Sequence, residues 1–418
     1  MTGGIGCDTS HAKVNRLLKK TAAVIVLLVP AIIGGFLIYA HVSYPTTSAV
    51  NVLTDLVYAE QHPHIALSKQ TIGFLPYWRL NTIEHARYDL LSEVNFFSLT
   101  IGSDGHIIQV TGHQTEPGWR WWNTQQVEDL IPKVQISGAN VGLTLAMLNN
   151  RDIRSFLRNP NAQQNLISDT LDQVHSRHLN AITLDFEYSG TPHRAYRRDF
   201  TAFSERFAAS LRQQASGTTL SVTLSPLAAR ERGLFDLPKL VPLVDRFIGM
   251  TYDYYNGSSD VAGPNAPMKG FSSHKFIFDV TTAYHDYLQV IPRTKIVMGI
   301  PYAGWDWAVR KGTALLSRTL PANNPNNYAA ILSYGRMRGF GELKPAQCQW
   351  DRDAEEPHCW YVDGKGIQHR VWFENNRSIA VKYAYAKANG FGGTAIWVLG
   401  YDSKYPDLWS ILRKTLQQ

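Results

Sequence analysis

The sequence contains no internal repeat and no low-complexity tract, and it carries little charge: 18% of its 418 residues are charged, whereas 44% are hydrophobic. That balance excludes wholesale disorder and allows a large buried core. Basic residues give a formal net charge of +7, but they are scattered, apart from a cluster near the N-terminus. Because there is no basic stripe and no recognised motif, we do not expect a nucleic-acid partner.

Cysteine is also scarce. Of the three cysteines, Cys7 lies near the N-terminus, whereas Cys348 and Cys359 lie close together. These two could form a disulfide in an exported domain or remain free thiols. A metal site that adds His358 would lack a second pair of ligands, and no glycine-rich dinucleotide fingerprint follows the first predicted strand. We therefore expect no metal and no cofactor.

Only one hydrophobic run is long enough to cross a membrane. Residues 21–40 are uncharged and almost wholly apolar, which matches the ~20 residues that a helix needs to span ~30 Å of hydrocarbon. Basic residues precede the run and none follows until Lys69, so the positive-inside rule places residues 1–20 in the cytoplasm and the rest outside. The alternative is a cleaved signal peptide with a cut site near Ala40 or Ala49. Either way, we expect an exported protein, anchored by a single helix or secreted.

Residues 41–68 are predicted to be a linker, and residues 69–418 to be one domain of alternating strands and helices. The clearest helical stretch runs from Arg194 to Gln214, with apolar residues at spacings of three and four. Alternation of this kind predicts an α/β fold, a (β/α)8 TIM barrel, with a doubly wound sheet as the alternative. The eight predicted strands begin at Thr71, Val94, Asn140, Ala181, Thr219, Arg246, Lys295 and Gly393.

Two segments exceed what a plain barrel needs. Asp104-Gly105, after the second strand, is a hairpin signal and predicts a small excursion. Residues from about 308 to 376 contain strand-like, aromatic and turn-rich pieces. We expect a small α+β insertion there, between strands 7 and 8.

Two carboxylates end the fourth predicted strand, in the stretch Asn180-Ala-Ile-Thr-Leu-Asp-Phe-Glu-Tyr188. Because successive side chains of a strand alternate between its faces, Thr183, Asp185 and Glu187 share one face. Acids that follow an apolar run are costly to bury unless they are paired or functional. The stretch alone fits either an acidic pair that caps a helix or meets an arginine, or an active site.

Other acidic and aromatic residues, together with one methionine, lie at or after the ends of later strands. In a TIM barrel the carboxyl ends of the strands carry the chemistry. Any one of these residues could be core packing, but together they suit a groove for a sugar polymer, because aromatic faces stack on sugar rings and acids act on the glycosidic bond. They are, in chain order, Met250, Tyr252, Asp253, Tyr302, Trp305 and Trp397.

From about Ile72 to Leu412 the chain resembles glycoside hydrolase family 18, the chitinase-like enzymes. The family pattern D-x-x-D-x-D-x-E corresponds here to Asn180-x-x-Thr183-x-Asp185-x-Glu187. Gly304-Trp-Asp-Trp307 is most similar to the bacterial branch that acts on spore cortex and other peptidoglycan. Further family-like segments are Met250-Thr-Tyr-Asp253, Gly263-Pro-Asn-Ala-Pro267, Gly299-Ile-Pro-Tyr302, Trp372-Phe-Glu-Asn-Asn-Arg-Ser378 and Gly393-Thr-Ala-Ile-Trp397.

The resemblance implies retaining, substrate-assisted hydrolysis of β-1,4-linked N-acetylglucosamine glycans, either peptidoglycan or chitin. Glu187 is implied to be the general acid, and Asp185 to orient the acetamido group that attacks the anomeric carbon. Tyr252 is implied to bind the acetamido carbonyl. Substrate binding is implied for Asp253, Trp397, Met250, Tyr302 and Trp305.

Two departures from the family pattern are visible, because Asn180 and Thr183 replace family aspartates. A threonine hydroxyl can donate a hydrogen bond but cannot share a proton as an acid does. We therefore expect the pH profile to differ while the reaction remains possible.

The alternative function is non-hydrolytic, lectin-like carbohydrate binding, which family relatives show once the catalytic acid is lost. Retention of Glu187, Asp185 and Tyr252 argues for the enzyme. We expect a monomer whose partner is an N-acetylglucosamine-containing polysaccharide.

Overall fold

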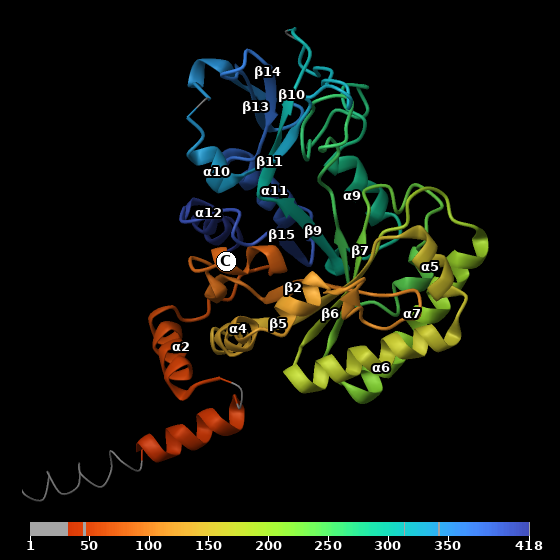
Figure 1. Cartoon of the computed structure of the whole chain (residues 1–418), viewed down its shortest axis with the longest axis vertical. Helices are drawn as coiled ribbons and strands as arrows, with labels where there is room; N and C mark the ends of the chain where they lie inside the picture. The colour runs from red at the N-terminus through yellow and green to blue at the C-terminus, as the bar shows by residue number, and fades with distance from the viewer. Residues whose placement is uncertain (1–31, 45–46, 313, 342, 418) are drawn as a thin grey trace, which may run out of the picture.

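The computed structural model describes residues 32–44, 47–312, 314–341 and 343–417 (Figure 1). Most of the predicted apolar span at residues 21–40 lies outside this part of the chain, although residues 32–43 are helical. Among the residues that the structure describes, no helix combines the length and the apolar character needed to cross a bilayer.

Eight parallel strands form a closed barrel, as the sequence predicts (Figure 1). The hydrogen-bonded order around the barrel is β1-β15-β9-β8-β7-β6-β5-β2. The doubly wound alternative is therefore wrong, and each predicted strand begins within one residue of an observed one. The strands are β1 (Gln70–Pro76), β2 (Glu93–Thr100), β5 (Asn140–Met147), β6 (Ala181–Phe186), β7 (Thr219–Leu224), β8 (Arg246–Gly249), β9 (Ile296–Pro301) and β15 (Gly393–Trp397).

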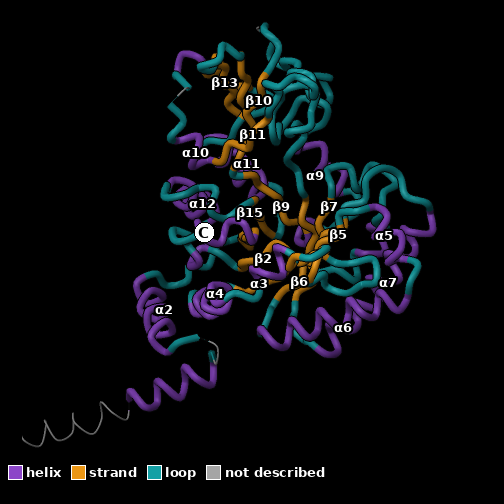
Figure 2. The backbone as a smooth tube through the Cα atoms, viewed as in Figure 1, coloured by secondary structure: helices purple, strands orange, loops and turns teal. Residues whose placement is uncertain are grey.

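Helices surround the barrel and cover the outward side of its strands (Figure 2). The predicted helix at residues 194–214 is confirmed as α7 (Arg194–Gln214), which buries Phe200, Phe203 and Phe207. The other helices that flank the barrel are α3 (Pro117–Trp122), α4 (Gln125–Ile136), α5 (Asn150–Leu157), α6 (Pro160–Arg177), α8 (Leu237–Leu240), α9 (Val280–Leu288), α11 (Asn376–Ala388) and α12 (Asp407–Leu416).

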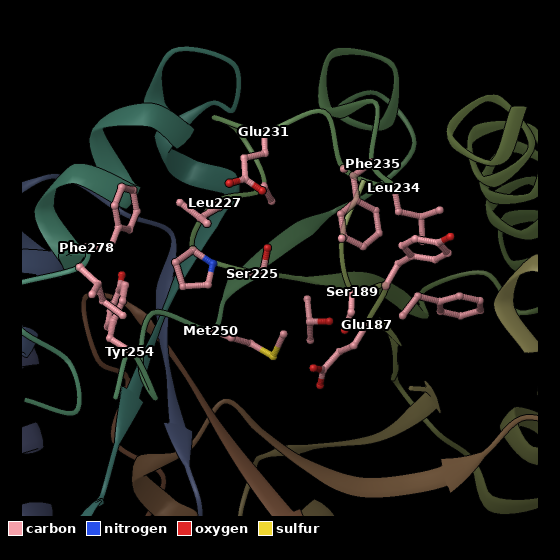
Figure 3. Close-up of a pocket in the computed structure, with 18 residues that line it drawn as sticks. Glu187, Ser189, Ser225, Leu227, Glu231, Leu234, Phe235, Met250, Tyr254 and Phe278 are labelled. Carbon is pink, nitrogen blue, oxygen red and sulfur yellow. The ribbon is translucent and has the colours of Figure 1, made fainter. Parts of the chain in front are cut away.

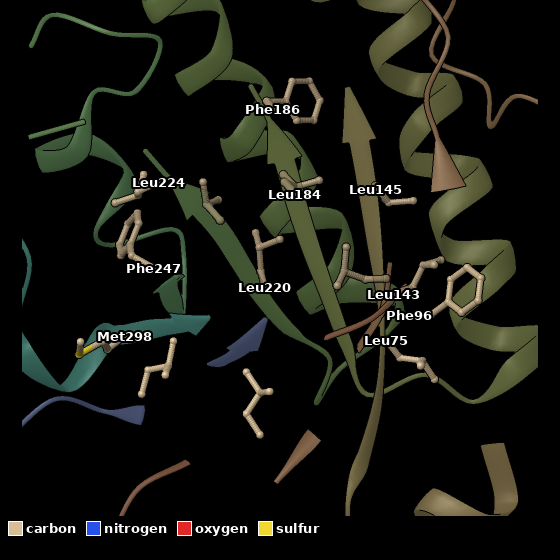
Figure 4. Packing of buried hydrophobic residues seen from close by; sticks show 14 of the residues in the cluster. Leu75, Phe96, Leu143, Leu145, Leu184, Phe186, Leu220, Leu224, Phe247 and Met298 are labelled. Atoms are coloured by element: carbon tan, nitrogen blue, oxygen red, sulfur yellow. The ribbon is translucent and has the colours of Figure 1, made fainter. Parts of the chain in front are cut away.

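Alternation along β6 determines which side chains reach the centre of the barrel. Leu184 and Phe186 point outward and pack between the strands and the helices (Figure 4). The rings of Phe186 and Phe200 lie 5.4 Å apart between their centroids. Thr183 and Asp185 consequently point inward, and both are fully buried. The apolar outer face thus fixes the register that carries the first carboxylate into the barrel.

Hydrogen-bonded polar groups fill the barrel interior below Asp185. Asn95 of β2 donates to the Thr183 hydroxyl at 3.0 Å and accepts from the hydroxyl of Thr144 at 2.6 Å. Glu93 and Arg246 form a buried ion pair at 2.6 Å. Burial of these groups is possible because each has a partner.

A five-stranded antiparallel sheet lies in the chain between β9 and β15, where the sequence predicts an insertion at residues 308–376. The sheet begins earlier than that, directly after Tyr302, because the seventh barrel strand continues almost without a break into β10. A disulfide joins Cys348 and Cys359 on neighbouring strands. In spatial order the strands are β11 (Ala329–Ser333), β10 (Ala303–Ala308), β14 (Gln368–Trp372), β13 (Glu356–Val362) and β12 (Cys348–Asp351), with α10 (Tyr334–Arg338) after β11.

Two smaller features complete the fold. After β2, where Asp104-Gly105 predicts an excursion, Gly105 has φ +83° and a short hairpin of β3 (Val110–Thr111) and β4 (Gln114–Thr115) follows. Residues 41–68, predicted to be a linker, include the helix α2 (Ala49–Gln61), which lies beside α4. Val52 and Asp55 are its buried residues.

Candidate active site

A cavity of about 240 Å³ opens at the carboxyl ends of the barrel strands. Six of the eight residues that the sequence singles out line it, and they come from β6, from the segment after β8 and from β15. The structure thus brings together side chains that are more than 200 residues apart in the sequence. The lining residues are Phe97, Asp185, Glu187, Thr223, Ser225, Pro226, Met250, Tyr252, Asp253 and Trp397.

Asp185 is the buried acid of this cavity. Its Oδ1 accepts a hydrogen bond of 2.5 Å from the Thr223 hydroxyl on the neighbouring strand β7. Its Oδ2 is buried and has no hydrogen-bond partner in the described part of the chain. Burial, followed by the charge of Glu187, raises the pKa of Asp185 to about 7, while the bond from Thr223 acts in the opposite direction. Asp185 therefore holds one oxygen in place and keeps the other free.

Glu187 follows the last residue of β6 and is exposed at the mouth of the barrel. Partial burial of its carboxyl raises the pKa of Glu187, and the charge of Asp253 raises it further. Two neighbouring carboxyls with raised pKa values retain a proton to higher pH than isolated ones do. The pair can thus supply a protonated acid near neutral pH.

An aromatic wall lies opposite these acids. The rings of Tyr252 and Trp397 are stacked, with centroids 6.0 Å apart and planes inclined by 10°. Phe97 meets the Trp397 ring edge-on at 4.8 Å. Burial and the charges of Asp253, Asp185 and Glu187 raise the pKa of Tyr252 well above its usual value, so its hydroxyl stays protonated and can donate a hydrogen bond.

Asp253 has an unusual backbone conformation, with φ +55°, a region that non-glycine residues seldom adopt. Asn265 fixes this turn because its side-chain oxygen accepts from the Asp253 amide at 3.0 Å. The Asp253 carboxylate accepts a hydrogen bond of 2.9 Å from Trp305 Nε1. Trp305 is half-buried and reaches the site through this bond rather than as part of the cavity lining.

A buried ionic cluster supports the Asn265 loop from the inserted sheet. Glu356 accepts hydrogen bonds from the amides of Asn265 and Ala266, at 2.9 and 2.7 Å. Lys382 of α11 lies 3.3 Å from Glu356 and 2.7 Å from Glu374, and all three side chains are fully buried. Burial raises the pKa of Glu356 to about 8, against the opposing charge of Lys382. The insertion thereby helps to position Asp253.

Tyr302, predicted to bind substrate, is not among the residues that line the cavity. Its side chain is fully buried, and its hydroxyl lies 2.6 Å from that of Tyr383 on α11. The chain leaves the barrel at this point to enter β10. Tyr302 therefore packs the joint between the barrel and the insertion. Met250, also predicted to bind substrate, does line the cavity.

A second cavity, of about 520 Å³, adjoins the first and shares residues with it, including Glu187, Thr223 and Met250. Figure 3 shows Glu187 and Met250 near one end of this space and Glu231 at the opposite end. Its wall is largely apolar, with Leu227, Leu234, Phe235 and Phe278. Glu187 thus lines both cavities.

Sequence reasoning missed Phe97, Thr223, Ser225 and Pro226. All four lie on β2 or at the end of β7. The rule that the carboxyl ends of barrel strands carry the site therefore applied to these strands as well. They were overlooked because they carry no charge and form no conspicuous pair. Thr223 is the most consequential omission, since its hydroxyl bonds to Asp185.

Residues 73–402, well over half of the chain, match the sequence profile described as Glycosyl hydrolases family 18. The cortical fragment-lytic enzyme of Bacillus cereus is 28% identical over 265 residues, which are 62% of this chain and 54% of that enzyme. The chain thus spans about half the length of that curated relative.

Solved structures share the fold. The spore cortex-lytic enzyme SleL of Bacillus megaterium superposes with a TM-score of 0.63 at 20% identity, covering 84% of this chain and 74% of that one. The Group IV chitinase of Ostrinia furnacalis, in complex with allosamidin, gives a TM-score of 0.71 at 18% identity, covering 83% and 98%.

Proposed function

The chain belongs to glycosyl hydrolase family 18, and from this premise we propose that it hydrolyses β-1,4-linked N-acetylglucosamine glycans with retention of configuration. The observation that carries the proposal is the joint presence of Asp185, Glu187, Tyr252 and Trp397 around one cavity. A second carboxylate placed as a nucleophile is not needed when the substrate's own acetamido group attacks the anomeric carbon.

In the proposed reaction Glu187 is the general acid. It donates its proton to the glycosidic oxygen as the bond to the anomeric carbon breaks, and it later accepts a proton from the attacking water. Its raised pKa lets it keep its proton to a higher pH than an isolated glutamate does. Because Glu187 lines both cavities, the sugar units on the two sides of the bond can each lie against the protein.

Asp185 and Tyr252 bind the reacting acetamido group. The free, buried Oδ2 of Asp185 accepts the acetamido N–H, which aims the carbonyl oxygen at the anomeric carbon. The protonated Tyr252 hydroxyl donates to that carbonyl. Trp397 supplies the floor for the sugar ring through stacking, and Asp253 binds one of its hydroxyls. Holding the nucleophile near its target accounts for much of the rate enhancement expected.

We propose peptidoglycan as the substrate, with chitin as the competing candidate. The relative from Bacillus cereus is described as a cortical fragment-lytic enzyme, and the neighbour from Ostrinia furnacalis as a chitinase. The sequence motif Gly304-Trp-Asp-Trp307 resembles the peptidoglycan-acting branch. Both polymers contain N-acetylglucosamine, so the same cavity chemistry serves either.

We also propose that the barrel works outside the cytoplasm. The apolar run at residues 21–40 follows basic residues, and none follows it until Lys69. The disulfide between Cys348 and Cys359 supports an oxidising compartment. Fractionation of cells that produce the full chain tests this location, and recovery in the soluble cytoplasmic fraction would oppose it.

The test of the reaction is replacement of Glu187 by Gln in the full chain. Products from purified peptidoglycan and from chitin oligomers are identified by mass spectrometry. Removal of the proton donor should abolish hydrolysis while oligosaccharide binding remains, because the amide keeps the shape of the side chain.

The matched control is Glu205→Gln, which makes the same chemical change at an exposed position on α7. It should retain wild-type turnover. Equal turnover by the Glu187→Gln protein would remove the assigned role. Binding without turnover by the wild-type protein would instead establish the lectin alternative.

A further inference from the structure

The inserted sheet carries a cavity of its own, about 480 Å³ in volume, which the proposed reaction does not use. Its lining residues come from β12, β13, β14 and the loop after β10. Trp360 and Arg370 are direct cross-strand partners, and His358 lies two residues before Trp360. All three therefore stand on one face of the sheet. The volume is within the range of ~300–1,000 Å³ that is typical of small-molecule sites.

Arg370 is the unusual member of this cavity. Only 4% of the residue is exposed, yet within the described residues no carboxylate forms an ion pair with it and burial is the sole influence on its pKa. One terminal nitrogen donates to the carbonyl of Ala314 at 2.9 Å, and Nε is buried without a partner. Burial alone lowers the pKa of Arg370. A buried cation without an anion is unfavourable, so the site gains stability when an anion arrives.

The other lining groups suit a sugar rather than a simple anion. Trp360 is 44% exposed and presents a ring beside the guanidinium, which allows stacking on a sugar face. Gln349 supplies an amide group to the lining, whereas the Gln368 amide bonds to the backbone of Gly312 and fixes the loop after β10 beside the cavity. The Nδ1 atom of His358 is also buried without a partner. An aromatic platform, an amide and an unpaired guanidinium together match a sugar that bears a carboxylate.

We propose that this cavity binds a carboxylate-bearing sugar unit of the glycan, with Trp360 stacked on the ring and Arg370 paired with the acid. Among the candidate substrates, only peptidoglycan contains such a unit, N-acetylmuramic acid, whose lactyl carboxylate is free where the stem peptide has been removed, whereas chitin is neutral throughout. The inference rests on the proposed function for its substrate class and gives the chain a means to distinguish the two polymers.

The experiment measures calorimetric binding to the full chain that carries Glu187→Gln, which prevents turnover. The ligands are a muramic-acid-containing tetrasaccharide with free lactyl carboxylates, the same glycan with its lactyl groups methyl-esterified, chitin tetraose, and a free stem peptide. Arg370→Gln and Trp360→Ala are each added to that background. Lys365→Gln serves as the control, because it removes one positive charge from the exposed turn between β13 and β14.

Loss of the Arg370 pairing should weaken binding of the acidic tetrasaccharide by about tenfold or more and leave chitin tetraose unchanged. Trp360→Ala should weaken binding of the same ligand. The Glu187→Gln protein should bind the esterified glycan as weakly as the Arg370→Gln variant binds the acidic one. Lys365→Gln should match the background protein. Because Trp360 is exposed, its variant decides the matter if Arg370→Gln does not fold.

Equal affinity for the acidic and esterified glycans would overturn the inference. So would an Arg370-dependent affinity for the free stem peptide, since the carboxylate would then not belong to the sugar. Turnover of peptidoglycan and of chitin oligomers by the protein with Glu187 intact separates the two proposals. Turnover together with equal affinity for the acidic and esterified glycans defeats this inference alone. Absence of turnover of both polymers by the wild-type protein, with Arg370-dependent binding of the acidic glycan preserved, defeats the proposed function alone.

Discussion

Replacement of Asp185 by Asn should make the protein more stable at neutral and alkaline pH while it removes activity. Asp185 is fully buried and its carboxylate faces Glu187. Asparagine has nearly the same shape, and its side-chain oxygen can still accept the hydrogen bond from Thr223. The substitution therefore removes a buried charge with little change in packing.

The magnitude follows from the pKa of Asp185, which burial and the charge of Glu187 raise from 3.8 to about 7. A shift of one pKa unit corresponds to about 1.4 kcal/mol, so ionisation of Asp185 lowers the native-state stability by about 4 kcal/mol. Because the folded pKa is raised, the penalty is absent below the unfolded value and grows as the pH rises toward 7. The difference between Asp185→Asn and wild type should be near zero at pH 4 and approach about 4 kcal/mol at pH 8.

Urea denaturation of both proteins between pH 4 and pH 9 measures this difference, with activity followed in parallel. Asp172→Asn on α6 is the control, because Asp172 is exposed. This substitution should change the free energy of unfolding by less than about 0.5 kcal/mol at any pH. A difference that does not depend on pH would refute the reasoning, since a packing effect has no such dependence. A fall in stability at pH 8 would refute it as well.

Two further predictions concern the supports of the site. Thr223→Val removes the 2.5 Å hydrogen bond that lowers the pKa of Asp185. The acidic limb of the pH–rate profile, measured from initial rates, should therefore move up by about one pH unit. An acidic limb at the wild-type pH would contradict this. Lys382→Met leaves the buried carboxyls of Glu356 and Glu374 without their cation, and the free energy of unfolding should fall by about 3–5 kcal/mol in denaturant titrations. Lys387→Met, at an exposed position of the same helix, should change it by less than about 1 kcal/mol.

The barrel could be predicted because each strand is buried on both faces and therefore stands out as a short apolar run. Helix α7 was equally clear, since Phe200, Phe203 and Phe207 repeat along one side of it. The site residues at strand ends followed from the barrel itself. Local pattern, in each of these cases, agrees with the final packing.

Tyr302 and the inserted sheet show where the local pattern does not determine the position of a side chain or a strand. The sequence does not mark the point at which β9 leaves the barrel, so alternation could not say which way Tyr302 points. The sheet pairs β10 with β14, so that Trp307 lies opposite Arg370. Pairing across so many residues leaves no local signal. The buried contacts of Lys382 with Glu356 and Glu374 were invisible for the same reason.

Thr183 occupies a position at which the family pattern has an aspartate, and the hydrogen bonds around it follow from that difference. Its hydroxyl accepts a hydrogen bond from Asn95, and Asp185 bonds sideways to Thr223 instead of to the position below it. Since a threonine cannot take up a proton, Thr183 cannot share the proton that Asp185 and Glu187 hold between them. Whatever favours ionised Asp185 therefore favours protonated Glu187, which is the form that the proposed reaction requires. In this chain the stabilising hydrogen bond to ionised Asp185 comes from Thr223 on the neighbouring strand.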